Sequence, residues 1–305
     1  MKYPGGQDYK FYYMRKTVFY IAIAIVFYTS SCQPESIDPP PPPPTPTIVD
    51  TTIKDIPYGS NGQQKFDLGL PGNRTSATSL AIVIHGGGWA TGDKNELSWL
   101  LNGLKQRGFV VANINYRTTL NSSDNYKMQL DDVDSALHVA ARLASTYVYN
   151  GQQIYILGHS AGGHLALCYA YTRNGAGQIK AVGSLSGPTD LFNLAYYNFN
   201  IYNPLLEPYL GMPLFPATPT ATQRYQDCSP FYQATATSPP TIFFHGELDP
   251  IVPIAQSTSL AGKLNSLSVD QKIIKYPFTF HDWWTDGTKT KNTMDELKAW
   301  FLAHP

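Results

Sequence analysis

The sequence predicts an α/β fold, with a mostly parallel central sheet and helices on both faces. Short apolar runs alternate along the chain with longer stretches of helical periodicity, as consecutive strand–helix units require. Some of the runs are continuously apolar, which is typical of strands buried on both faces, and the run 81–84 is the clearest of them. Residues 51–305 are enough for one large domain with a substantial core.

Strands and helices can be placed in chain order. The helix that we expect over 128–144 carries Asp131, Asp132 and Asp134, which we interpret as a solvent-exposed face rather than a metal site, because aspartate side chains are mostly exposed. The expected strands cover 66–70, 81–85, 109–115, 154–157, 181–186, 241–245 and 272–276, and the expected helices cover 96–106, 128–144, 162–171, 255–267 and 294–302.

The stretch 191–233 interrupts the alternation between two sheet strands. It is rich in Tyr, Phe, Asn and Pro. Long insertions in compact domains are usually functional, so we interpret this stretch as an aromatic-rich cap that builds a substrate pocket. Aromatic walls with polar tips suit a sugar or a phenolic group. The alternative is a surface loop whose aromatic side chains pack on one another.

The segment Gly158-His159-Ser160-Ala161-Gly162 fits the G-x-S-x-G pattern of a nucleophile elbow. A strand-like run precedes it and a buried helix is expected after it, which is the setting that the motif requires. The two glycines let the backbones around a strained turn pass closely. The alternative is an ordinary glycine-rich turn between a strand and a helix.

A nucleophilic serine needs a base, and the base needs an acid that orients it. In chains with this elbow the order is serine, acid, histidine. His281 and His304 are the candidates near the end, and we favour His281 because the penultimate residue is expected to fray. Of the acids between Ser160 and His281, Glu247 and Asp249 follow a strand; Asp249 precedes a rigid proline and is preferred, with Glu247 as the alternative. A histidine in this position can also be a capping or core residue.

A second motif, His85-Gly86-Gly87-Gly88-Trp89, follows the apolar run 81–84. Acyl transfer develops negative charge on a carbonyl oxygen, so its site needs N–H donors aimed there in advance. Glycine loops of this kind supply such donors together with the residue after the nucleophile. We therefore expect an oxyanion hole made by the amides of Gly87, Gly88 and Ala161. The alternative is a flexible glycine turn.

These motifs resemble those of the α/β-hydrolase esterases of the HGGG group. The resemblance is closest to the bacterial feruloyl-esterase-like and acetyl-esterase-like branch, which neighbours hormone-sensitive-lipase-type esterases and arylformamidases. It covers residues from about 55 to the end. The residues that carry it are His85 to Trp89, Gly92-Asp93-Lys94, Asn113 to Arg117, Gly158 to His164, Gly187 to Leu191, and His245 to Asp249 with Val252-Pro253.

The resemblance implies an α/β-hydrolase fold and a serine carboxylester hydrolase that needs neither a metal nor a cofactor. The expected substrate is a small-molecule or polysaccharide ester, from which acetyl or feruloyl groups are removed. An arylformamidase, a general short-chain esterase and a non-catalytic binding protein of the same fold remain alternatives, since fold alone does not imply function. The intact set of Ser160, Asp249, His281 and the glycine loop argues against the last of these.

The N-terminal segment predicts export. An apolar run over 18–28 follows Arg15 and Lys16 and is too short to span a membrane comfortably. With the small residues before Cys32 it resembles a bacterial lipoprotein signal, so we expect 1–31 to be a signal peptide and Cys32 to be lipidated. Plain secretion and an uncleaved anchor remain alternatives. The expected location is the periplasmic or cell-surface side of a membrane.

The same segment predicts where the domain begins. Counted from Met14, the chain has a compact charged, apolar and small-residue layout, so we expect Met14 to be the translation start. Residues 32–50 contain a proline run that predicts a stiff polyproline II tether. The catalytic domain is expected over 51–305.

Composition excludes one class of partner. The chain has 22 Lys and Arg against 22 Asp and Glu, whereas nucleic-acid binding calls for a basic face. Cys168 is expected to be a small buried apolar residue and Cys228 to lie in the cap. A disulfide between them is allowed in an oxidising compartment, but we predict that they stay unpaired.

Overall fold

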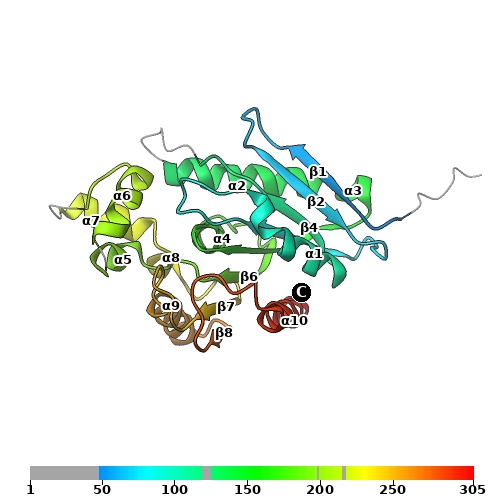
Figure 1. Cartoon of the computed structure of the whole chain (residues 1–305). Helices are drawn as coiled ribbons and strands as arrows, with labels where there is room; N and C mark the ends of the chain where they lie inside the picture. Colours follow the sequence, from blue (N-terminus) through cyan, green and yellow to red (C-terminus); the bar gives the residue numbers. More distant parts are fainter. Residues whose placement is uncertain (1–47, 119–124, 198, 215–217) are drawn as a thin grey trace, which may run out of the picture. The chain divides into compact units, whose positions relative to one another are not determined.

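The computed structural model describes residues 48–118, 125–197, 199–214 and 218–305. Within these residues an eight-stranded sheet runs in the order β1-β2-β4-β3-β5-β6-β7-β8 (Figure 1). β1 and β2 pair antiparallel, as do β2 and β4, and every other neighbouring pair is parallel. The prediction of an α/β fold with a mostly parallel sheet is confirmed.

The strands match the seven predicted ones and add an edge strand. This strand, β1, pairs only with β2, and its mixed polar and apolar sequence gave no continuous run to detect. The bounds are β1 (Thr51–Pro57), β2 (Lys65–Leu70), β3 (Ser79–Ile84), β4 (Val110–Ile114), β5 (Asn150–His159), β6 (Ile179–Leu185), β7 (Thr241–Gly246) and β8 (Gln271–Tyr276).

All five predicted helices are present. The last begins two turns earlier than predicted, because its polar first turns are capped by Asp286, whose side chain accepts from two backbone amides. The helices between strands are α1 (Ser98–Gln106) after the short η1 (Lys94–Leu97), α2 (Asn125–Arg142), α3 (Ala144–Tyr147), α4 (Ala161–Thr172) and α9 (Ala255–Ser266), and α10 (Gly287–Ala303) follows the last strand.

The sheet divides the core into two apolar layers. In β3, Ile82 and Ile84 face the layer under α2, α4 and α9, whereas Ala81 and Val83 face the layer under α1 and α10. Figure 1 shows α2 and α10 on opposite faces of the sheet. Both faces of the central strands are thus buried, which explains their continuously apolar sequences.

The predicted insertion 191–233 is helical. It forms α5 (Leu191–Tyr197), α6 (Phe199–Leu210), α7 (Pro219–Asp227) and α8 (Pro230–Gln233) between β6 and β7. α5, α6 and α7 gather at one side of the sheet in Figure 1.

One surface prediction was wrong. Asp132 is fully buried on α2, where Arg117 binds it through its side chain and its backbone amide, with Nη2 2.5 Å from Oδ1. Gln64 donates a further bond of 2.7 Å to the same carboxylate. The partners come from distant segments, so helical periodicity alone could not reveal that Asp132 is buried.

Cys168 and Cys228 are buried and unpaired, as predicted. The signal peptide, the Met14 start, Cys32 and the proline run lie outside the described residues. Across the described part of the chain, none of the helices combines the length and the apolar character needed to cross a bilayer.

Candidate active site

Ser160 occupies a sharp turn between β5 and α4. Its φ of 53° and ψ of −121° lie where a non-glycine residue is strained. The glycines around it leave no room for side chains. A Cβ on Gly158 would lie 2.4 Å from the backbone of Gly162, and one on Gly162 would lie 2.1 Å from the carbonyl oxygen of Ile84. The turn therefore requires both glycines and projects Ser160 from the end of the strand.

His281 and Asp249 meet at the neighbouring strand ends. His281 Nδ1 lies 2.6 Å from Asp249 Oδ2, and both residues are buried. The other carboxylate oxygen, Oδ1, accepts from the amides of Ile251 and Val252 at 2.9 and 2.8 Å. Asp249 is therefore fixed at both oxygens.

The ionisation of Asp249 follows from these contacts. Burial by itself would raise the pKa of its carboxyl group, but hydrogen bonds with His245 and His281 outweigh burial and lower that pKa. Asp249 is therefore a carboxylate at neutral pH. Glu247, the alternative acid of the sequence analysis, is exposed, and the structure pairs His281 with Asp249 instead.

Backbone contacts hold the loop of His281 against the loop of Asp249. The amide of Leu248 donates to Thr279 at 2.9 Å, and the amide of Glu247 donates to Tyr276 at 3.0 Å. A Cβ on Gly246 would lie 2.3 Å from the carbonyl oxygen of Phe280. The close approach of the two loops therefore depends on a glycine at the end of β7.

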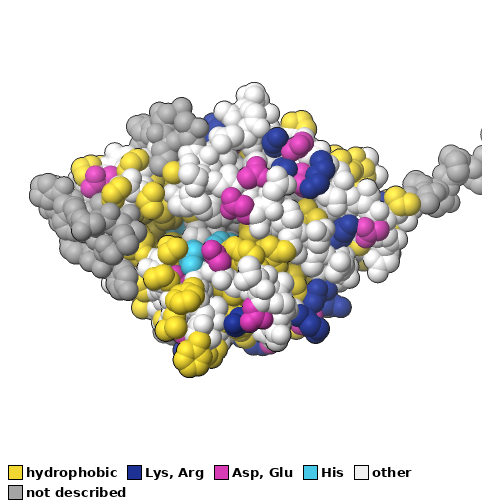
Figure 2. Space-filling view, viewed as in Figure 1, with side chains coloured by type: hydrophobic (Ala, Val, Ile, Leu, Met, Phe, Trp, Pro, Cys, Tyr) yellow, Lys and Arg dark blue, Asp and Glu magenta, His cyan; other side chains and the backbone are white. Residues whose placement is uncertain are grey.

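Ser160 and His281 line one cavity of about 440 Å³. Within the described residues no hydrogen bond joins Ser160 Oγ to His281 Nε2. This is compatible with a catalytic pair, because catalytic hydrogen bonds are often long until substrate binds. Figure 2 shows histidine and acidic side chains together in a hollow, with hydrophobic side chains around it.

The glycine loop forms another wall of this cavity. Gly87 and Gly88 have φ values of 102° and 57°, and a Cβ on Gly87 would lie 2.1 Å from the carbonyl oxygen of Thr91. None of the hydrogen bonds described uses the amide of either glycine. Ala161 lines the same cavity and is the first residue of α4, where the helix offers its amide no partner. The three residues predicted to supply the donors thus line one cavity.

The predicted cap contributes side chains to the same cavity, namely Leu194, Tyr202 and Leu205. Of the described aromatic side chains in this segment, only Tyr202 lines the cavity. Tyr209 and Tyr225 are buried instead, and Tyr209 stacks on Trp89 with ring centroids 4.6 Å apart. The expectation of an aromatic pocket wall from this segment therefore holds for one residue, while others stabilise the insertion.

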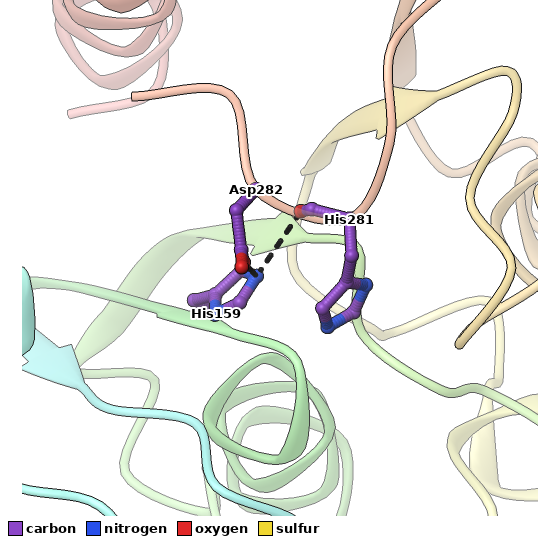
Figure 3. Close-up of side chains that lie close together, drawn as sticks. All are labelled: His159, His281 and Asp282. Atoms are coloured by element: carbon purple, nitrogen blue, oxygen red, sulfur yellow. Dashed lines mark hydrogen bonds and ion pairs between the residues drawn. The ribbon is translucent and has the colours of Figure 1, made fainter. Parts of the chain in front are cut away.

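Sequence reasoning missed His159 and Asp282, which flank the two central residues of the site. His159 Nε2 lies 3.4 Å from both Asp282 Oδ1 and the carbonyl oxygen of His281 (Figure 3). Burial, followed by the nearby His281, lowers the pKa of His159 to about 3. The available signal was position, because His159 precedes Ser160 and Asp282 follows His281 in the chain.

The sequence model of the BD-FAE family matches residues 66–264, which include the glycine loop, Ser160 and Asp249. The chain belongs to the BD-FAE family. This assignment agrees with the feruloyl-esterase-like branch inferred from the motifs.

Curated proteins similar to this BD-FAE chain are mostly carboxylic ester hydrolases. A probable isoprenylcysteine α-carbonyl methylesterase of Arabidopsis thaliana is 28% identical, over 75% of this chain and 50% of its own. A probable carboxylic ester hydrolase, LipM of Mycobacterium tuberculosis, is 28% identical over 74% and 55%. A kynurenine formamidase of Danio rerio is 29% identical over 54% and 52%. The chain spans about half the length of the curated relatives it matches.

Solved structures share the fold. A bifunctional GH43-CE protein of Bacteroides eggerthii matches with a TM-score of 0.71 and 22% identity, over 83% of this chain and 38% of its own. Esterase B of Lactobacillus rhamnosis matches with a TM-score of 0.70 and 20% identity, over 83% and 86%. The BD-FAE chain thus has the α/β-hydrolase fold.

Proposed function

We propose that the chain is a serine carboxylic ester hydrolase that acts through an acyl-enzyme. The observation that carries this proposal is the convergence of three segments on one cavity: Ser160 at the elbow, His281 paired with Asp249, and the glycine loop. Each group has the role that acyl transfer requires, namely nucleophile, oriented base and oxyanion donors.

The tautomer of His281 decides the direction of proton transfer. Its Nδ1 faces the Asp249 carboxylate, which can only accept, so the proton resides on Nδ1. Nε2 then has a free lone pair for the proton of Ser160. Ser160 Oγ attacks the ester carbonyl, and the amides of Gly87, Gly88 and Ala161 bind the oxyanion.

The remaining steps return the enzyme to its starting state. Collapse of the tetrahedral intermediate breaks the ester bond, and the departing alcohol takes the proton from His281. Water then attacks the acyl-Ser160 carbonyl and gives a proton to the same nitrogen. Release of the acid returns that proton to Ser160. No bound metal is needed for either half of the reaction.

The substrate class that we favour is an acylated polysaccharide or oligosaccharide bearing acetyl or feruloyl groups. The walls of the cavity include Trp89, Tyr202 and Trp284, and aromatic faces suit sugars and phenolic rings. No Lys or Arg is among the described residues that line it, which favours a neutral ester over an anionic one. The match to a GH43-CE structure is consistent with this choice.

An arylformamidase is the second candidate, because a kynurenine formamidase is among the relatives. A panel of p-nitrophenyl acetate, p-nitrophenyl butyrate, methyl ferulate, acetylated xylan and N-formylkynurenine separates the two. We expect ester hydrolysis that Ser160→Ala abolishes. Cleavage of the formamide alone would favour the second candidate, and full activity of Ser160→Ala would refute the mechanism.

We further propose that the mature protein begins at a diacylated Cys32 and is exported to the periplasmic or cell-surface side of a membrane. One acyl chain anchors weakly and two anchor stably. Mass spectrometry of the natively produced protein should find lipidated Cys32 at its N-terminus. A soluble mature form with an unmodified peptide spanning residue 32 would refute the anchor, and any peptide from residues 1–13 would refute the Met14 start.

A further inference from the structure

His159, His281 and Asp282 form a cluster of side chains that all have metal-ligating atoms. One such atom from each residue lies within 4.8 Å of the others. His159 ends β5, and the other two follow β8, so the cluster brings the end of a central strand together with the loop after the last strand (Figure 3). The esterase mechanism uses only His281 from this group.

We propose that the three side chains form a reversible binding site for a divalent transition-metal cation, best matched by Zn²⁺, and that the bound ion blocks hydrolysis. Two imidazole nitrogens and one carboxylate oxygen are a donor set that zinc sites with an open position use. Mg²⁺ and Ca²⁺ prefer oxygen ligands alone and should not compete. The inhibitory consequence rests on the proposed function, whereas the binding does not.

Each histidine presents a ring nitrogen to the cluster. That of His159 is Nε2, which lies 3.4 Å from Asp282 Oδ1. His281 Nδ1 is held by Asp249, which leaves Nε2 as the nitrogen that can bind. A carboxylate on the far nitrogen of a metal-binding histidine is a common outer-shell arrangement in zinc sites. The contact with Asp249 therefore orients His281 both as the base of the proposed reaction and as a metal ligand.

The three ligand atoms need to move only a little to bind one ion. Tetrahedral zinc with bonds of ~2.0–2.1 Å places its ligand atoms about 3.4 Å apart. The His159 ring packs against His281 and Trp284, with centroids 4.7 and 4.6 Å away, so it is held in place. The Asp282 side chain is 59% exposed and can rotate toward the two rings.

The surroundings favour a cation. His159, His281 and Asp282 all line the cavity of about 440 Å³, which has room for a water ligand. Glu96 adds a second carboxylate to its lining, and the described lining residues include no Lys or Arg. A cation therefore meets attraction without opposing positive charge.

The expected effect on hydrolysis follows from one atom. Zn²⁺ on His281 Nε2 occupies the lone pair that would take the proton of Ser160. The serine then stays protonated and unreactive, and removal of the ion by a chelator restores the base.

The test uses the full chain and measures binding separately from activity. Calorimetric titration of Ser160→Ala with Zn²⁺ should show one site per chain at micromolar concentration. The double variant with Asp282→Asn should bind Zn²⁺ at least about tenfold more weakly, which is the loss seen when a group that supports a metal site is removed. Because Asp282 is exposed, this variant should fold. His159→Gln should weaken binding similarly.

His304→Gln is the matched control, because His304 Nε2 lies 2.9 Å from Asp270 in a surface pair away from the cavity. It should leave zinc binding unchanged. In the otherwise unmodified chain, Zn²⁺ but not Mg²⁺ should inhibit hydrolysis of p-nitrophenyl acetate, and EDTA should reverse it. Binding that survives both site substitutions, or no binding at all, would overturn the metal site. Zinc binding without any hydrolysis would contradict the esterase proposal alone.

Discussion

Replacing Asp249 with asparagine should inactivate the enzyme through the tautomer of His281. The two oxygens of Asp249 have different tasks, because Oδ1 accepts from the amides of Ile251 and Val252 while Oδ2 faces His281. An asparagine must keep its oxygen toward the two amides, so its NH₂ group faces His281 Nδ1. That nitrogen must then accept, and the ring proton moves to Nε2. The base can no longer take a proton from Ser160.

The size of the loss can be estimated. Comparable substitution in a Ser-His-Asp protease lowers kcat on the order of 10⁴ by the same change of tautomer. Each tenfold loss corresponds to ~1.36 kcal/mol of barrier, so the transition state should lose about 5 kcal/mol. The fold should survive, since the two backbone hydrogen bonds are kept.

The assay is steady-state hydrolysis of p-nitrophenyl acetate together with thermal unfolding. Glu247→Gln is the matched control, because Glu247 lies two residues away on the same loop and is exposed. It should change kcat less than about threefold, the scale of a surface substitution. Equal losses in the two variants would show that Asp249 does not orient the base.

Two further predictions concern the walls of the site, and a third concerns the buried His164. Leu205→Ala should raise kcat/KM for butyryl relative to acetyl esters by roughly tenfold, because Leu205 lines the cavity from the cap. Gly87→Ala should lower kcat by about 10² or more, since its φ of 102° and the nearby Thr91 carbonyl disfavour any Cβ. His164→Gln should make the protein less sensitive to acid. Burial lowers the pKa of His164 from 6.5 to about 4, so the neutral side chain is compatible with the fold above pH 6.5. As the pH falls from 6.5 to 4, the unmodified chain should lose roughly 3 kcal/mol of its free energy of unfolding through this group.

Each of these has a control in the chain. Leu206→Ala should lower stability but keep the acyl ranking, because Leu206 is buried outside the cavity lining. Gly62→Ala should be neutral, since its Cβ would meet nothing within 4 Å. His138→Gln should leave acid unfolding unchanged, because its side chain is exposed. A shifted acyl ranking in Leu206→Ala would contradict the argument for Leu205, and loss of activity in Gly62→Ala would contradict the argument for Gly87. Equal acid-unfolding curves for His164→Gln and the unmodified chain would contradict the argument for His164.

The parts that were predictable from sequence are those encoded locally. The elbow and the glycine loop each span only a few residues. Their glycines are required because a Cβ would clash with neighbouring backbone atoms, as at Gly158 and Gly162. The central strands were predictable because burial on both faces leaves them continuously apolar. The choice of Asp249 relied on the order of elements along the chain.

The parts that were missed depend on distant partners. Asp132 is buried only because Arg117 and Gln64 reach it from other segments. β1 and the first turns of α10 have polar residues, so neither has an apolar pattern that identifies it. The contact of His159 with Asp282 brings the end of β5 against the loop after β8, which the order of the motifs did not reveal.

Trapping the acyl-enzyme tests the central claim most directly. The protein is mixed with p-nitrophenyl butyrate, quenched in acid within the first turnovers, digested and examined by mass spectrometry. We predict a butyryl adduct on the peptide that contains Ser160, absent from Ser160→Ala and reduced in His281→Ala. Rapid hydrolysis with no adduct on Ser160, or an adduct on another residue that persists in Ser160→Ala, would contradict the account.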